Sequence, residues 1–325
     1  MNTEELIQYA KENALSGKVL DRYSIIKLLE IDPNSKEAEK LGESARDVAR
    51  EVVSNKGKVW ASIGVDYQPC SMNCSFCSFG EKWAATKESY TWSDNEVISF
   101  VRKFASEGAF WITLRTTEFF GFDRLCELAK KIRSTVPGNY KLVVNTGEFN
   151  DERARLLTQA GFEIVYHSVR LNEGVDTPFL VENRCKTLKA IQNTNMDLAH
   201  LVEPIGIEHT NEEIADVFIT ALNHGAKLSG AMSRIPIPGT PLYHHGQLPE
   251  RRLAQIVAIT RLVAGNLAPD ICVHPPSQLA MEWGANVVVV DVGAVPRDSN
   301  NLNSEWQSFD VKTAKKWFEN AGYED

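Results

Sequence analysis

The sequence predicts an α/β protein built as a (β/α)8 barrel of the TIM type, and three observations support this. Beyond residue 58, a short apolar strand, a polar loop and an amphipathic helix follow one another eight times. Several strands are rich in Val and Ile with little polar interruption, as parallel strands covered by helices are. The 325-residue chain shows no break in composition, which favours one closed barrel over an open, doubly wound sheet.

The repeated unit indicates where each element should lie. Strands are expected at residues 59–65, 110–115, 141–145, 163–169, 198–203, 227–234, 271–274 and 286–291. Amphipathic helices are expected at residues 95–105, 123–134, 151–160, 184–194, 211–224 and 249–264. Ser93, Asn150 and Asn211 are cap-competent residues at three of the helix starts. The last crossover is short and carries a weak helix at residues 277–283, so the sequence leaves closure of the barrel open at this point.

The two ends of the chain are expected to add helices to this barrel. Residues 1–58 form a helical extension, with helices at residues 3–15, 23–29 and 35–53 that should cover the lower mouth of the barrel. Residues 59–325 form the barrel itself, and a last helix at residues 311–321 should pack on its outside. No linker separates these parts, so we expect one domain overall.

Composition excludes several classes of function. With 43% hydrophobic and 24% charged residues, the chain has the balance of a soluble globular protein. A formal charge of −8 argues against a nucleic-acid partner. The start of the chain lacks the features of a signal peptide, and no apolar run approaches the ~18 residues of a membrane span. Six cysteines without a secretion signal indicate a reducing, cytoplasmic location.

Three cysteines in one short loop are the strongest chemical feature of the sequence. Cys70, Cys74 and Cys77 follow the first expected strand, where a barrel carries its reactive groups. Three thiolates can hold three irons of a cubane iron–sulfur cluster and leave the fourth iron open. A structural zinc site would need a second set of ligands, and three cysteines so close together do not pair evenly as disulfides. A thiol redox motif would use only two of them.

The run Cys-x3-Cys-x2-Cys, with Phe76 before its last cysteine, resembles the signature of the radical S-adenosylmethionine (SAM) enzymes. The resemblance implies a [4Fe–4S] cluster whose open iron binds the amino and carboxylate groups of SAM. Reductive cleavage of SAM would then give methionine and a 5′-deoxyadenosyl radical that abstracts hydrogen from a substrate. It also implies an anaerobic environment and a flavodoxin- or ferredoxin-type electron donor.

Polar residues stand at the carboxyl ends of the other expected strands, where any one alone could be a solvated loop charge. Together they indicate a site, because charges in a barrel mouth are costly unless paired or used. The set comprises Arg115, Glu118, Asn145, Glu148, His167, Arg170, Glu173, Glu203, Arg234, His274, Asp291 and Arg297. The resemblance implies SAM contacts for some of them. Glu118 stands where the family often has Gly-Gly-Glu, although the glycines are threonines here, and Arg184 resembles the arginine that binds the SAM carboxylate. Phe76 and the turn at Gly206 resemble the adenine site, with Asn145 and Arg170 as further candidates.

Secondary motifs are similar to one branch of the family. Asn145-Thr146-Gly147, the Gly206–Glu208 turn and Pro238-Gly239-Thr240-Pro241-Leu242 resemble those of biotin synthase, [FeFe]-hydrogenase maturase E and methylornithine synthase. Biotin synthase itself is disfavoured, because its second cluster takes cysteines from interior strands. The corresponding residues here are Trp111 or Ile112, Val144 and Val202, with His274 near its arginine. Cys126 and Cys185 fall on helices, and only Cys272 could face the interior.

The remaining polar residues suggest a cavity for a small anionic or amino-acid-like substrate. Its expected lining is Arg115, His167, Arg170, Glu203, Arg234 and His274. The leading hypothesis is hydrogen abstraction from such a substrate without a second cluster. Sulfur insertion of the lipoyl or biotin synthase type is the alternative enzyme. An iron–sulfur scaffold or accessory protein is the alternative outside the enzymes.

Overall fold

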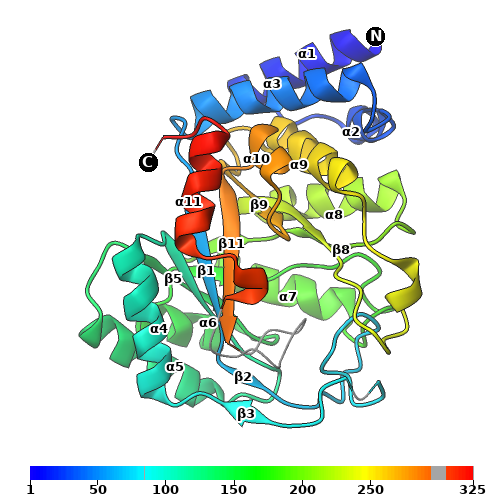
Figure 1. Ribbon diagram of the computed structural model, residues 1–325. Coiled ribbons are helices and arrows are strands. Elements are labelled where there is room, and N and C mark those ends of the chain that lie inside the picture. Colours follow the sequence, from blue (N-terminus) through cyan, green and yellow to red (C-terminus); the bar gives the residue numbers. More distant parts are fainter. Residues whose placement is uncertain (84, 294–304, 325) are drawn as a thin grey trace.

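The computed structural model describes residues 1–83, 85–293 and 305–324 (Figure 1). Arg297 therefore lies outside the described residues. Nine strand segments form one parallel sheet that closes on itself: β1 (Lys58–Gly64), β4 (Trp111–Arg115), β5 (Lys141–Asn145), β6 (Ile164–Tyr166), β7 (Asp197–Ala199), β8 (Val202–Ile205), β9 (Ala226–Ser233), β10 (Asp270–His274) and β11 (Val287–Gly293). The segments β7 and β8 together make the fifth strand, because both pair with β9. The fold is the eight-stranded barrel that the sequence predicts.

The barrel is closed at the point that the sequence left open. β10 pairs with β9 over five residues and with β11 at Cys272↔Val287 and Val273↔Val288. β11 pairs with β1 over the full length of both strands. The last crossover holds only the short helix α10 (Gln278–Glu282). A weak crossover helix therefore does not prevent closure, because the strands themselves form the ladder.

Helices surround the barrel, and several of them begin at a side-chain cap. They are α4 (Asp94–Glu107), α5 (Phe122–Thr135), α6 (Asp151–Ala160), α7 (Val181–Gln192), α8 (Asn211–Asn223), α9 (Glu250–Ala264) and α11 (Val311–Asn320), with short 3-10 turns η1 (Tyr243–His245) and η2 (Trp306–Ser308). Ser93 and Glu96 form a capping box at α4. The cap of α8 is Thr210 rather than the expected Asn211, and α7 begins at Val181, three residues earlier than expected.

The first three helices lie across the end of the barrel at which the strands begin. They are α1 (Thr3–Ser16), α2 (Arg22–Leu29) and α3 (Lys36–Val52). Figure 1 shows α1 and α3 on the far side of α9, opposite the tip of the β11 arrow. Gly42 of α3 lies directly against the Trp283 ring, leaving no room for a side chain. Gln255 of α9 donates a hydrogen bond to the Ile31 carbonyl at 2.6 Å. Among the described residues, no helix is long and apolar enough to cross a membrane.

Side chains close the lower half of the barrel. Its interior core contains Trp60, Trp111, Val143, Ile164, Ala199, Leu201, Leu228, Cys272 and Val287. The prediction that Val144 and Val202 face the barrel interior is wrong. Both belong, with Ile112, to the core between the strands and the surrounding helices. The residues that face the interior beside Trp111 are Val143 and Leu201, one position earlier in each strand. Since this core is filled, a ligand can enter only at the carboxyl ends of the strands.

Candidate functional site

A cavity of about 280 Å³ opens at the carboxyl ends of the strands. Its upper wall carries the three loop cysteines with Met72, Phe76 and Phe79. Its floor is aromatic and apolar, formed by Trp60, Leu201, Met232 and Val289 beside Tyr166. Between wall and floor lies a polar ring: Ser62, Asp66, Thr113, Arg115, Thr116, Thr117, Glu118, Asn145, Arg170, Glu203, Ser233, Arg234, His274 and Asp291. The cavity is thus less polar than the sequence predicts.

Backbone hydrogen bonds hold the cysteine loop in place. The Cys70 amide donates to the Phe79 carbonyl at 2.6 Å, and the Cys77 amide donates to the Cys74 carbonyl at 2.9 Å. Asn73 takes a left-handed conformation with φ of 49°, which asparagine tolerates better than most residues. The hairpin of β2 (Asp66–Tyr67) and β3 (Tyr90–Thr91) packs beside the loop, where Tyr67 and Phe79 stack with ring centroids 6.1 Å apart.

The three thiols fit an iron–sulfur cluster. Burial raises the pKa of each of them, and that of Cys74 rises to about 12 although the Arg170 guanidinium opposes the shift. Thiols with a raised pKa still become thiolates when a metal binds them. All three line one wall of the same cavity. The donor set therefore suits a cluster with three protein ligands and one side turned to the cavity.

Glu118 sits at the edge of this cavity against a glycine. A Cβ atom at Gly147 would collide with the Glu118 carboxylate, so only glycine lets the carboxylate lie there. Burial raises the pKa of Glu118, while Arg170 opposes the shift. Asn145 lines the same edge and donates through its side-chain amide to the Tyr166 carbonyl at 3.0 Å.

Arg184 and His167 lie behind the main cavity rather than in it. With Arg170, Glu118 and Asn145 they line a smaller cavity of about 70 Å³. The Arg184 Nε atom lies 3.3 Å from Glu173 Oε2, and its guanidinium lies over the Phe179 ring at 4.6 Å. Burial lowers the pKa of His167 to about 3, so its imidazole is neutral. Arg170 lines both cavities and therefore connects them.

A half-buried tyrosine, Tyr166, joins β6 to the fifth strand beside the cavity. The Tyr166 hydroxyl donates a short hydrogen bond to the Glu203 carboxylate, and Arg170 Nε lies 3.7 Å from Glu203 Oε1. Burial raises the pKa of Glu203, with Arg170 opposing. The Tyr166 ring meets the Trp60 ring edge-on at 5.4 Å. Sequence reasoning did not assign Tyr166 to the site, although its alternation with Ile164 along β6 places it in the interior.

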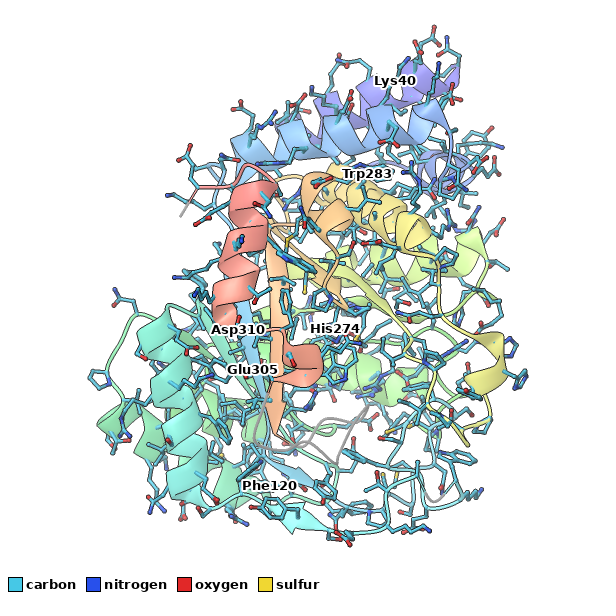
Figure 2. The ribbon with its side chains drawn as sticks, in the orientation of Figure 1. Lys40, Phe120, His274, Trp283, Glu305 and Asp310 are labelled. Atoms are coloured by element: carbon cyan, nitrogen blue, oxygen red, sulfur yellow. The ribbon has the colours of Figure 1, made fainter. Side chains whose placement is uncertain are left out.

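Arg115 and His274 on the opposite wall both face the Asp291 carboxylate. Asp291 lies 3.4 Å from Arg115 Nη1 and 3.4 Å from His274 Nε2. Figure 2 shows His274 beside the short helix η2, and its ring centroid is 5.7 Å from that of Trp306. This wall therefore presents charges of both signs to the cavity.

Arg234 and Gly206 come together through Glu208. Arg234 forms a two-pronged ion pair with Glu208, and a Cβ at Gly206 would collide with both side chains. Burial by itself raises the pKa of Glu208, but the hydrogen bonds from Arg234 outweigh it and hold that pKa at about 2. Arg234 lines the main cavity, whereas Gly206 lines neither cavity.

Curated proteins and solved structures that resemble this chain were found. No family model matches the chain. A biotin synthase of Persephonella marina is 23% identical over 268 residues, covering 80% of this chain and 78% of the relative. A biotin synthase of Clostridioides difficile is 21% identical over 274 residues, covering 81% and 83%. Methylornithine synthase superposes with a TM-score of 0.80 at 15% identity, covering 97% of this chain and 96% of that one. The [FeFe]-hydrogenase maturase HydG from Carboxydothermus hydrogenoformans gives 0.77 at 14% identity, covering 98% and 79%.

The closed barrel with a cysteine loop after its first strand defines a barrel enzyme with its active site at the carboxyl ends of the strands. The structural neighbours establish the fold, and the curated relatives extend the likeness over four-fifths of the chain. The curated relatives and the structural neighbours together support the radical SAM superfamily, in the branch of biotin synthase, HydG and methylornithine synthase. The prediction of the family from the cysteine loop is confirmed.

Proposed function

We propose that the protein binds one [4Fe–4S] cluster through Cys70, Cys74 and Cys77 and abstracts hydrogen from a small substrate in the barrel cavity. The observation that carries this proposal is the position of three half-buried thiols on one wall of a 280 Å³ cavity. When bound, the cluster and SAM supply a 5′-deoxyadenosyl radical by reductive cleavage. The residues of the chain position the two molecules and keep water from the radical. A cytoplasmic flavodoxin or ferredoxin is the proposed electron donor.

SAM is proposed to lie between the cysteine loop and the smaller cavity. Its ammonium group would face Glu118, whose carboxylate lies against Gly147. Its carboxylate would face the guanidinium groups of Arg184 and Arg170, because planar guanidinium groups bind carboxylates with two parallel hydrogen bonds. Phe76 offers an apolar surface for the adenine at the cavity wall.

The substrate is proposed to be small and amino-acid-like. Arg115, Asp291 and His274 present both signs of charge on one side of the cavity. Glu203 and Arg170 do the same on the other side. A molecule with both an ammonium and a carboxylate group can form ion pairs with side chains of both signs on these walls. Its apolar part would then contact the aromatic floor of the cavity. Transfer of deuterium from a labelled candidate into 5′-deoxyadenosine would identify the substrate.

Sulfur insertion is the second candidate, because the curated relatives are biotin synthases. The positions of the other cysteines favour hydrogen abstraction without a second cluster. Cys126 lies on α5 and Cys185 on α7, while Cys272 alone of these three belongs to the interior core. Metal analysis separates the two proposals. More than about four irons per chain after reconstitution would favour sulfur insertion, with Cys272 as the first ligand to test.

The loop cysteines provide the direct test. Replacing Cys70, Cys74 and Cys77 by Ala should abolish both the iron–sulfur absorption and the release of 5′-deoxyadenosine under dithionite. The matched control replaces Cys126, Cys185 and Cys272 by Ala, which should leave both intact. A full cluster in the loop variant would contradict the proposal. A wild-type protein that holds the cluster but releases no 5′-deoxyadenosine would instead indicate a scaffold protein.

A further inference from the structure

A buried pair, Asp66 and Thr117, joins the segment that leads into the cysteine loop to the turn that carries Glu118. Asp66 lies on β2, four residues before Cys70, and is 4% exposed. One of its carboxylate oxygens accepts the Thr117 amide at 2.9 Å, and the other accepts the Thr117 hydroxyl. Thr117 is itself 8% exposed. Both carboxylate oxygens are thus engaged with a single residue.

The same turn is held from its other side. The Thr116 hydroxyl lies 3.0 Å from the Thr146 hydroxyl, and the Thr116 amide donates to the Asn145 carbonyl at 3.0 Å. The turn after β4 is therefore tied both to β2 and to the loop after β5. Glu118 follows directly and lies against Gly147 of that second loop. The two ties hold the backbone from which the Glu118 side chain extends toward Gly147.

We propose that Asp66 and Thr117 are positioning residues that hold the Glu118 carboxylate where it receives the ammonium group of SAM. This inference rests on the proposed function of Glu118. Hydrogen bonds to a buried carboxylate are charge-assisted, and removing one partner leaves the other unsatisfied. Asp66 acts through Thr117, because both of its oxygens are already used. The pair also links two sides of the proposed SAM site, the cysteine loop and the Glu118 turn.

The side chain of Thr117 permits a matched series of variants. Thr117→Val keeps the volume and removes the hydroxyl, whereas Thr117→Ser keeps the hydroxyl. The dissociation constant of SAM is measured anaerobically on reconstituted protein with the iron content checked. Thr117→Val should raise that constant roughly five- to ten-fold, while Thr117→Ser should stay near wild type. Asp66→Asn should act in the same direction as Thr117→Val. Thr260→Val removes another buried hydroxyl, on α9, and should not change SAM affinity.

Two further measurements separate positioning from a general structural effect. A SAM analogue without the α-amino group should bind Thr117→Val as tightly as it binds wild type. In a Glu118→Gln background, Thr117→Val should add no further loss, since the two residues act as one unit. Equal SAM affinity in wild type and Thr117→Val, or equal losses for SAM and the analogue, would overturn the positioning role alone. A cluster-loaded wild type that does not bind SAM would overturn the proposed function as well.

Discussion

At the scale of single residues, the structure divides the proposed site into a front and a back. The cysteine loop, Phe76 and Glu118 line the main cavity, whereas Arg184 is 2% exposed and lies in the cavity behind it. Arg184 is held there by Glu173 and by the ring of Phe179. A guanidinium fixed in this way is pre-oriented for a carboxylate, since little side-chain entropy remains to be lost on binding.

Replacing Arg184 by Ala should weaken SAM binding by roughly ten- to a hundred-fold, because a charge-assisted pair is lost. The variant should also unfold more easily, since the buried Glu173 carboxylate loses the nearer of its two arginine partners and keeps only Arg170. Binding is measured by equilibrium titration with SAM on cluster-loaded protein. Arg46→Ala is the control, a buried arginine that contacts Tyr323 near the other end of the barrel. Normal SAM affinity in the Arg184 variant would move the assignment to Arg170.

At the scale of elements, the sequence predicts positions well and side-chain direction less well. The strand at residues 141–145 and the helix at residues 151–160 have the bounds that the apolar pattern indicates. The predicted side-chain direction is wrong in β5 and in the fifth strand. There Val143 and Leu201 face the barrel interior, rather than Val144 and Val202. When a strand is buried on both faces, apolar residues do not alternate with polar ones along it. The sequence then does not indicate which of two neighbouring residues faces the barrel interior.

The side-chain contacts within the site could not be predicted from the sequence either. The cysteine loop could be recognised because its ligands are close together along the chain. Tyr166 and Glu203 are 37 residues apart, and Asp66 and Thr117 are 51 residues apart. Whether such residues meet depends on which strands become neighbours and on the register in which those strands pair. The pattern of a single sequence indicates neither. Of the twelve polar residues predicted at the strand ends, eight line the main cavity: Arg115, Glu118, Asn145, Arg170, Glu203, Arg234, His274 and Asp291.

Closure between β9 and β10 depends on one glycine. Gly230 has φ of 137°, and a Cβ there would collide with the Cys272 carbonyl of β10. Gly230→Ala should therefore lower the free energy of unfolding by on the order of 2–4 kcal/mol, as measured in urea. Gly225→Ala is the matched control, with positive φ of 76° and no atom within 4 Å of the added Cβ. It should cost only about 1 kcal/mol. Equal losses in the two variants would show that backbone conformation, and not the close approach of the strands, is responsible.

At the scale of the whole molecule, the barrel buries two neutral histidines between its strands and helices. His167 is 2% exposed and His200 is 0% exposed. Burial lowers the pKa of each to about 3. In the unfolded chain these two histidines therefore bind protons near pH 6.5, whereas in the folded protein they stay neutral at that pH. Each histidine contributes stability that is fully present above pH 6.5 and is lost as the pH falls toward 3.

The free energy of unfolding should consequently fall between pH 6.5 and 5, by about 1.4 kcal/mol per pH unit for each buried histidine. Buried carboxyls such as Glu203, whose pKa burial raises, act in the opposite sense. The test is therefore the difference between wild type and His200→Gln. Glutamine can keep the acceptor for the Val169 amide, which lies 3.1 Å from His200 Nε2. The slope of stability against pH, from anaerobic urea unfolding of the cluster-free proteins, should be smaller by about one proton in the variant. Parallel curves for the two proteins would mean that His200 is protonated in the folded barrel.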